Sequence, residues 1–289
     1  MTPPRRIFPD LRPKSRRLAV MPAPDFLVYS LIGVLSGLVG GLLGIGGSTI
    51  FIPAATLIHG PDQQVYQAAA MILNAVVATT ATIKHHRNGM LERPLLIKMM
   101  IPATILVLIG VAIGNHLGGE ILARLFGILL LILAVSEAKS LIGRRRTTKT
   151  NTPGEEPDQR AAPWVLMPIG GLMGFLGGLL GIGGGTVGVP MLRFFGRLPL
   201  RKAIANTAAV TIPLALIGGI YKNISLSSLP EFTDSRSGQA LWIALALIPG
   251  AILGSWMGAS LVHRLPLVAI RIAFLGLLVF VGTRMVGLH

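Results

Sequence analysis

The chain has 289 residues, of which 52% are hydrophobic and only 13% are charged, and its mean hydropathy is +0.70. Soluble globular domains carry roughly 25% charged residues, so water cannot solvate this whole surface and lipid must cover much of it. The net charge of +15 could suit a nucleic-acid binder. The basic residues, however, gather at the N-terminus and between apolar runs, as orientation in a membrane requires.

Eight apolar stretches are long enough to cross a membrane as helices, because a hydrocarbon core of ~30 Å needs about 20 mostly apolar residues. A basic tail, residues 1–25, precedes the first of them. The eight stretches are 26–46, 66–84, 95–116, 121–142, 164–183, 203–221, 239–261 and 266–286. Two runs too short to span, 48–58 and 186–195, follow the first and fifth stretches. We interpret both as broken or re-entrant helices, which persist at membrane depth only inside protein or beside a wet cavity.

A polar linker, residues 143–162, separates the chain into two halves, 26–142 and 163–289. The halves share the sequence GLLGIGG, at 41–47 and again at 178–184, an offset of 137. The fold predicted is an all-α integral membrane protein with two tandem repeats of about four transmembrane helices each, plus the short segments. Many transporters combine two such repeats and bind their substrate between them.

The orientation of the repeats depends on how often each half crosses the membrane. Four crossings per half make the repeats parallel, and both termini then lie in the cytoplasm with most of the basic residues. This arrangement also puts Lys222 and Arg236 in the cytoplasm, and the basic loop 193–202 outside. If the short segments cross fully, the repeats become inverted instead.

Clustered glycines precede each short run, in GLLGIGGSTIFIP of the first half and GLLGIGGGTVGVP of the second. A helix that breaks inside the membrane exposes unpaired N–H groups where its second piece begins. These groups and the helix dipole together favour an anion, and hydroxyl groups lie beside them in both motifs. The substrate site predicted from the motifs consists of Gly46, Gly47, Ser48, Thr49, Gly183, Gly184, Gly185 and Thr186.

Small and polar residues elsewhere in the stretches have two interpretations each. The glycines upstream of the motifs have the spacing that lets two helices pack closely, and we assign Gly33, Gly37 and their counterparts in the second half to packing. Asn74, Asn206 and Thr207 either join helices by hydrogen bonds or contact the substrate, and we include them in the candidate site.

No charged residue occupies the centre of a long stretch, although a charge there would mark function. Backbone dipoles and hydroxyls should therefore hold the substrate, while Arg201 and Lys202, just before the sixth stretch, attract it to the mouth of the pathway. The sequence contains no GxxxxGK(S/T) nucleotide loop and no HExxH zinc helix. Because cysteine is also absent, we predict no metal, no cofactor and no catalytic residue.

The doubled pattern G-x-x-G-I-G-G-(S/G)-T-x-x-x-P resembles the TauE/SafE family of sulfite exporters, over about residues 26–286. RLPLRKAIANT at 197–207 is similar to the family's basic loop leading into an Ala- and Thr-rich helix, whereas PDQQVYQAAAMI at 61–72 departs from it. The two halves could thus contribute unequally to the site. The resemblance implies a multi-pass protein of the bacterial cell inner membrane that moves sulfite, an organosulfonate or a related anion.

Sequence and resemblance together predict an exporter of a small anion that binds between the two glycine motifs. Two alternatives stay open: an uncoupled, channel-like anion pathway, and an intramembrane enzyme or assembly factor. A channel would pass current without alternating access, and an enzyme would consume its substrate in detergent. The expected partners are the anion and the lipid bilayer, a coupling ion and a homo-oligomer are left open, and nucleic acid is excluded.

Overall fold

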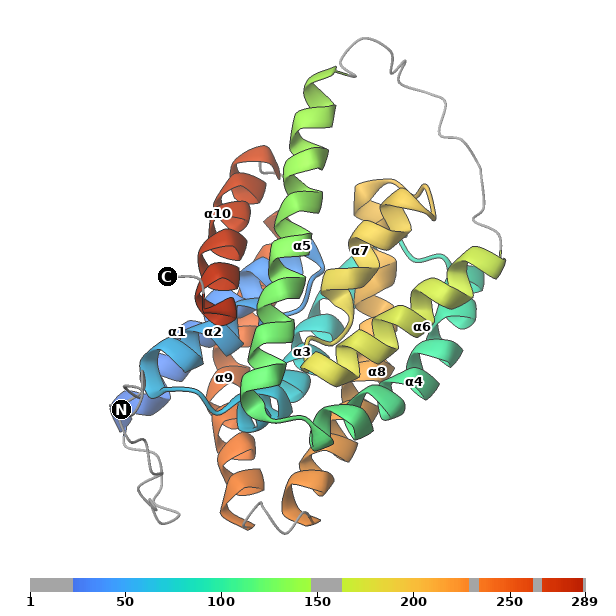
Figure 1. Ribbon diagram of the computed structural model, residues 1–289. Coiled ribbons are helices and arrows are strands. Elements are labelled where there is room, and N and C mark those ends of the chain that lie inside the picture. The colour runs from blue at the N-terminus through green and yellow to red at the C-terminus, as the bar shows by residue number, and fades with distance from the viewer. Residues whose placement is uncertain (1–22, 147–162, 229–233, 262–266, 288–289) are drawn as a thin grey trace, which may run out of the picture.

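The computed structural model of the chain describes residues 23–146, 163–228, 234–261 and 267–287, and they form helices with short connections (Figure 1). The helices are α1 (Ala23–Leu43), α2 (Ser48–His59), α3 (Gln63–Arg87), α4 (Arg93–His116), α5 (Gly119–Arg146), α6 (Pro163–Leu180), α7 (Gly185–Phe194), α8 (Leu200–Ser228), α9 (Asp234–Leu261) and α10 (Leu267–Val286). Each of the eight stretches and both short runs corresponds to one of these helices. The all-α prediction is therefore confirmed, whereas most of the basic tail and of the linker lies outside the described residues.

Several helices differ in length from the stretches expected. The sixth stretch was expected to end at residue 221, but α8 continues to Ser228. The fourth stretch was expected to end at residue 142, but α5 continues to Arg146, into the segment assigned to the linker. The fifth was expected to span, but α6 has 18 residues and its apolar part is shorter than a span requires. Among the described residues, six helices are long and apolar enough to cross a membrane, namely α1, α3, α4, α5, α8 and α9.

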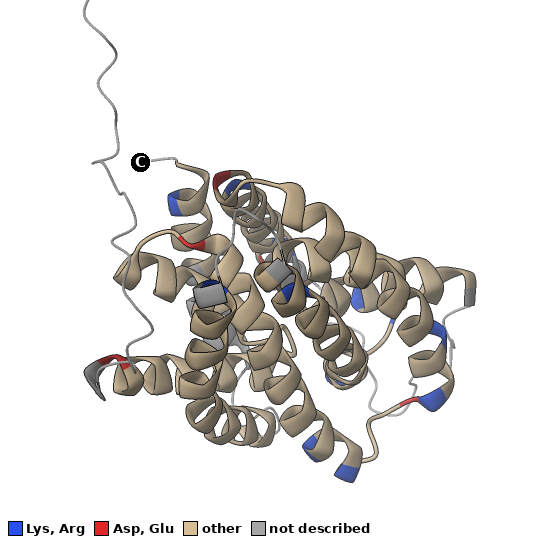
Figure 2. Cartoon of the chain, turned by 90° about the horizontal axis from the view of Figure 1, so that it is seen from below, with Lys and Arg blue, Asp and Glu red and all other residues tan. Residues whose placement is uncertain are grey.

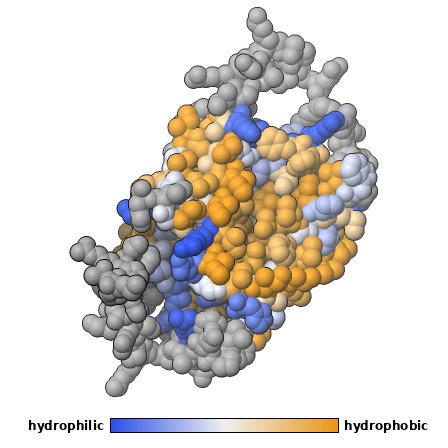
Figure 3. All heavy atoms as spheres, in the orientation of Figure 1, coloured by the Kyte–Doolittle hydropathy of each residue, from blue (hydrophilic) through white to orange (hydrophobic). Residues whose placement is uncertain are grey.

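The outer surface of the helices is apolar, as lipid contact requires. On α4, Ile97, Ile101 and Ile105 recur every four residues and are each more than half exposed, so they form one stripe of the helix. Figure 3 shows a broad hydrophobic area on the side of the molecule in view. Most of the ribbon carries no charged residue, and the charged positions gather toward helix ends (Figure 2). These features are typical of a multi-pass membrane protein.

The glycines that we assigned to packing bring helices of the two halves together. On α1, a Cβ atom added at Gly33, Gly37 or Gly41 would strike the backbone of α9. On α6, a Cβ atom added at Gly170 or Gly174 would strike the backbone of α4, which runs beside α6 in Figure 1. Small residues thus let these backbones pack at closest approach, and the packing interpretation is confirmed for these five glycines.

The helix pairs follow the pattern that a duplication would produce. α1 of the first half packs on α9 of the second, and α6 of the second half packs on α4 of the first. Since α1 corresponds to α6 and α4 to α9 in chain order, each pair is the counterpart of the other. The two repeats themselves stay a prediction, which this exchange of partners supports.

Each glycine motif forms the turn of a helical hairpin. Tyr29, near the start of α1, stacks on His59, the last residue of α2, with ring centroids 5.1 Å apart. A Cβ atom at Gly188 of α7 would lie 2.6 Å from the Met173 sulfur of α6. The chain therefore enters the bundle along α1 or α6, turns at the glycines, and returns toward the same end along α2 or α7. This confirms the expectation of broken helices.

Contacts at the two ends of the bundle show that the corresponding helices α3 and α8 run in opposite directions. Asn206, near the start of α8, accepts a hydrogen bond from the N–H of Glu92, in the loop after α3, at 2.9 Å. At the other end, Arg236 at the start of α9 lies 3.7 Å from Asp62, just before α3. The parallel arrangement expected from the charge count is therefore wrong, and the inverted alternative holds for these helices. Each short segment forms a hairpin with the helix before it, and a hairpin returns to the side of the membrane from which it entered. Each half of the chain therefore crosses the membrane an odd number of times.

The two ends of the bundle differ in charge. We call the end where α5 finishes and α6 begins the linker end, and the end where α1 begins and α10 finishes the termini end. Among the described residues, the basic ones toward the linker end are Lys84, Arg87, Arg93, Lys98, Lys139, Arg144, Arg145, Arg146, Arg193, Arg197, Arg201, Lys202 and Arg271. In the described helices, those of the termini end are Arg124, Lys222, Arg236 and Arg284.

We expect the linker end to face the cytoplasm, because short cytoplasmic segments carry an excess of Lys and Arg. The start of α1 and the end of α10 then lie on the side of the membrane opposite the cytoplasm. This reverses the location of the termini that the sequence predicted. Green fluorescent protein inserted after residue 154 should fluoresce, and alkaline phosphatase inserted there should be inactive. Active alkaline phosphatase in the linker would show that the orientation is the other way round.

Candidate functional site

The two glycine turns meet inside the bundle. A Cβ atom added at Gly185 would lie 2.7 Å from the carbonyl oxygen of Gly44, so the turns touch through their backbones. Gly46 has φ +83° and Gly184 has φ +74°, a region that costs other residues roughly 1–2 kcal/mol. Glycine is thus required at both positions, for conformation and for space. Gly47 and Gly183 complete the two turns, and a Cβ at Gly183 would collide with Asn74.

Asn74 connects the turns through its side chain. It is fully buried near the midpoint of α3. Its Oδ1 atom accepts a hydrogen bond from the Ser48 N–H at 3.1 Å, and its Nδ2 atom donates one to the Gly181 carbonyl at 3.3 Å. The start of α2 is therefore capped by a protein side chain, and we infer that Asn74 holds the two motifs in register.

The start of α7 is different from the start of α2. The residue at the repeat offset from Asn74 is Thr211 of α8, whose hydroxyl donates to the Thr207 carbonyl at 2.9 Å instead. Gly184 precedes α7 in a left-handed conformation, and within the described part of the chain no side chain caps this helix as Asn74 caps α2. The N-terminus of α7 thus keeps its positive dipole end without a side-chain acceptor. The two motifs are not equivalent, as the unequal halves of the sequence suggested.

Four hydroxyl groups of the predicted site are buried without a partner. Ser48, Thr49, Thr186 and Thr207 are each at most 1% exposed, and their hydroxyl oxygens have no hydrogen bond within the part of the chain that the structure describes. A buried hydroxyl without a partner costs roughly 1–3 kcal/mol. Such a cluster at a membrane-protein centre indicates that a polar ligand or water completes it.

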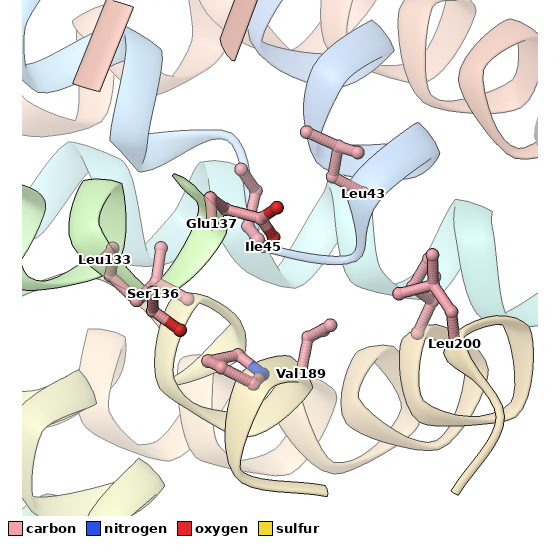
Figure 4. A pocket seen from close by; sticks show the side chains of 10 residues that line it. Leu43, Ile45, Leu133, Ser136, Glu137, Val189 and Leu200 are labelled. Atoms are coloured by element: carbon pink, nitrogen blue, oxygen red, sulfur yellow. The ribbon is translucent and has the colours of Figure 1, made fainter. Parts of the chain in front are cut away.

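A pocket reaches the second motif. It has a volume of about 30 Å³, roughly twice the 10–15 Å³ that one water occupies on this measure. Thr186 and Pro190 of α7 line it, together with residues from the α1–α2 turn, α5 and α8. Figure 4 shows Leu43 at the end of α1, Ile45 of that turn, Ser136 and Glu137 of α5, and Leu200 of α8 around the space. Its walls are therefore mostly apolar, with a few polar groups.

One charged side chain, that of Glu137, is among the residues that line the pocket. Glu137 was not among the site residues predicted from the sequence, and it is half-buried in the wall of the pocket. A carboxylate repels an anion, so an anion should bind on the Thr186 side. Arg201 is exposed one residue after Leu200 of the pocket wall, in agreement with a role at the mouth. Lys202 lies 3.3 Å from Glu92, so part of its charge is neutralised.

Asn206 forms its hydrogen bonds with backbone groups. Besides the N–H of Glu92, it contacts the Met90 carbonyl at 3.3 Å and the Lys202 carbonyl at 2.8 Å. All these groups belong to the linker end of the bundle, away from the turns. We therefore leave Asn206 out of the proposed anion site. Thr207, one residue later, lies beside α7, since a Cβ at Gly188 would be 2.7 Å from its methyl group.

Two polar residues near the pathway were missed in the sequence. Gln67 is fully buried beside Gly181, and both amide atoms lack a partner among the described residues. Lys222, which the charge count assigned to a cytoplasmic segment, is 1% exposed within α8. The signal for Gln67 was the run of three glutamines at 63–67, since amides are unusual at the start of an apolar stretch.

Comparisons with known proteins agree with this architecture. The chain is 27% identical over 270 residues to a "probable membrane transporter protein" of Haemophilus influenzae, covering 90% of this chain and 97% of that one. It is 23% identical over 279 residues to the "probable membrane transporter protein YunE" of Bacillus subtilis, covering 91% and 97%. The "probable membrane transporter protein MamO" of Magnetospirillum gryphiswaldense is 25% identical over 272 residues.

The match to MamO covers 84% of this chain but only 42% of that protein, so this chain spans about two fifths of its length. No solved structure matches the chain. The model of the family described as "Sulfite exporter TauE/SafE" matches residues 29–285, which include every helix pair and both glycine turns. The chain is therefore a multi-pass membrane protein that belongs to the TauE/SafE family of transporters.

Proposed function

We propose that the chain exports a small oxyanion, sulfite or an organosulfonate, across the bacterial inner membrane. The observation that carries this proposal is the Thr186 hydroxyl, which is buried without a partner at the uncapped start of α7 and lines the pocket. A hydroxyl donor and the positive end of a helix dipole offer an anion favourable contacts without a full opposite charge. The family description names sulfite, and an organosulfonate presents the same three oxygens.

The depth of the site suits transport. An anion that enters the bilayer must exchange its water shell for other donors, because unsatisfied polar groups in hydrocarbon cost several kcal/mol each. The turns lie beside Asn74, at the middle of α3. A dipole end contributes roughly half an elementary charge, which holds an anion weakly enough to release it again.

The two hairpins favour a transporter over an open channel. They enter from opposite ends of the bundle, and the pocket contacts Thr186 of the second motif without contacting Thr49 of the first. This asymmetry supports a transporter that exposes its site to one side of the membrane at a time. A channel would need an open pathway past both turns.

Thr186→Val tests the site directly, because valine keeps the shape of threonine and removes only the hydroxyl donor. We expect at least about tenfold weaker sulfite binding to the purified protein in calorimetry, since a hydrogen bond to a charged group contributes about 1.5–3 kcal/mol and 1.4 kcal/mol corresponds to about tenfold. The matched control is Thr79→Val, because Thr79 is exposed on α3 and bonds its own helix at Ala75.

Sulfite, an alkylsulfonate and acetate should be compared in the same experiment, with flux measured in proteoliposomes. We expect saturable flux of sulfite and of the alkylsulfonate. This flux should be lost in Thr186→Val and kept in Thr79→Val. Unchanged sulfite affinity in Thr186→Val would remove Thr186 from the site. Current that does not saturate would favour the channel-like pathway.

A further inference from the structure

Lys222 is a buried cation held by neutral groups. Its side chain is 1% exposed, and its ammonium donates to Gln64 Oε1 and, at 2.7 Å, to Asn115 Oδ1. No carboxylate lies within ion-pair distance of it among the described residues. An ammonium group has three donors, and two of them have partners within the described part of the chain. A buried charge that lacks a counter-charge is costly, so the arrangement favours a negatively charged ligand.

The amide partners of Lys222 are themselves fixed in orientation. Gln64 Nε2 donates to the Gly114 carbonyl at 3.1 Å and to the Leu117 carbonyl at 2.9 Å, at the end of α4. A carbonyl oxygen can only accept hydrogen bonds, so the amide nitrogen must point to these two groups and the amide oxygen to Lys222. The positive group is thus positioned by α3 and α4, near the termini end.

The inner face of α3 connects this cluster to the glycine turns. Gln64, Gln67, Met71 and Asn74 are spaced by three or four residues and so share one face of the helix. Gln64 contacts Lys222, Gln67 lies beside Gly181, and Asn74 bonds both turns. The ten residues from Gln64 to Asn74 cover about 15 Å at 1.5 Å per residue. Gln67 lies between the two sites with both amide atoms unpartnered.

The facing helix α8 has a matching line of residues. Thr207, Thr211, Gly218 and Lys222 also lie on one helical face, from the second motif to the termini end. A Cβ added at Gly218 would lie 2.8 Å from the terminal methyl group of Met71. A Val107 methyl group of α4 would be equally close, at 2.7 Å, so Met71 and Val107 together fill the space beside Gly218. Of the two, methionine readily changes rotamer.

We propose that Lys222, with Gln64 and Asn115, forms a second binding site for the transported oxyanion at the termini end, and that Gln67 passes the anion between this site and the glycine turns. The proposal rests on the proposed function, and it adds the charged group that the turns lack. In its protonated form Lys222 supplies the positive charge, while Met71 and Val107 close the path beside Gly218 of α8 in the conformation seen here.

Lys222→Gln separates the charge from the hydrogen bonds, because glutamine donates to amide oxygens but carries no charge. In proteoliposomes that contain the full chain, we expect radiolabelled sulfite counterflow to fall at least about tenfold, which corresponds to 1.4 kcal/mol. Sulfite binding at the turns, measured in detergent, should stay within about twofold. The control is Lys139→Met, which removes an exposed lysine on α5. Wild-type counterflow in Lys222→Gln would overturn the proposal.

Gln67→Leu keeps the proposal testable if Lys222→Gln fails to fold. Because Gln67 has no hydrogen bond to lose, leucine should leave the melting temperature unchanged or raise it, while counterflow falls. The matched control is Gln239→Leu at an exposed position of α9. Normal counterflow in Gln67→Leu would overturn the proposed path. The proposed function itself fails if the wild type binds no sulfite, or if it binds sulfite no more tightly than Thr186→Val does. This outcome is distinct from normal counterflow in Lys222→Gln or in Gln67→Leu.

Discussion

Gly184→Leu should abolish sulfite transport while the chain still inserts into the membrane. Gly184 has φ +74°, and its added side chain would begin 2.8 Å from the backbone carbonyl of Met173. Leucine at this φ costs about 1–2 kcal/mol, and the clash must be relieved by moving the start of α7. Thr186 moves with it and leaves the pocket. Gly46→Leu should have the same effect, because its Cβ would lie 2.7 Å from Asn74 Oδ1.

Gly89→Leu is the matched control for both substitutions. Gly89 has φ +67°, in the turn between α3 and α4, and a Cβ there would meet nothing within 4 Å. It therefore imposes the same conformational cost without the collision. We expect near-normal sulfite flux in Gly89→Leu, and membrane insertion of all three variants by fractionation. Wild-type flux in Gly184→Leu and Gly46→Leu would show that the turns are not part of the substrate pathway.

Asn74→Leu should lower both stability and transport more than any other single change on α3. Leucine has the same branched arrangement of heavy side-chain atoms as asparagine but leaves the Ser48 N–H and the Gly181 carbonyl without their partners. Each buried backbone group left unpaired costs about 1–3 kcal/mol, so the loss should be about 2–6 kcal/mol of folding free energy. The melting temperature in detergent and sulfite affinity measure the two effects separately.

Asn206→Leu is the informative comparison for Asn74→Leu. Asn206 also bonds backbone groups, but those of Glu92, Met90 and Lys202 at the linker end. We expect it to lower the melting temperature and to leave the sulfite affinity of the folded protein unchanged. Equal losses of sulfite affinity in the two variants would mean that Asn74 acts only through stability.

The helices could be predicted from the sequence because apolar length is sufficient to specify them in lipid. The hairpins were also predictable, since Gly46 and Gly184 stand directly before runs too short to span. The orientation of the halves was not predictable from charge. Arg197, Arg201 and the loop after α3 lie at the same end of the bundle only because α3 and α8 run in opposite directions, which depends on the hairpins turning back.

The site was predictable in part, because backbone geometry follows from glycine whereas side-chain partners depend on packing. Asn74, Asn206 and Thr207 were equivalent candidates in the sequence. Hydrogen bonds between residues more than 100 positions apart place Asn74 at the glycine turns and Asn206 at the loop after α3. Lys222 could not be placed either, since its burial depends on Gln64, 158 residues away in the sequence.

The position of a bound anion tests the account most directly. Selenite has the shape and charge of sulfite and contains an anomalously scattering atom, so it can be located in crystals of the wild-type protein. We predict an anomalous peak between the two glycine turns, within hydrogen-bond distance of the Thr186 hydroxyl, that is lost in Thr186→Val. A peak only against Arg201 or His86, at the linker end and away from both turns, would contradict the proposed site.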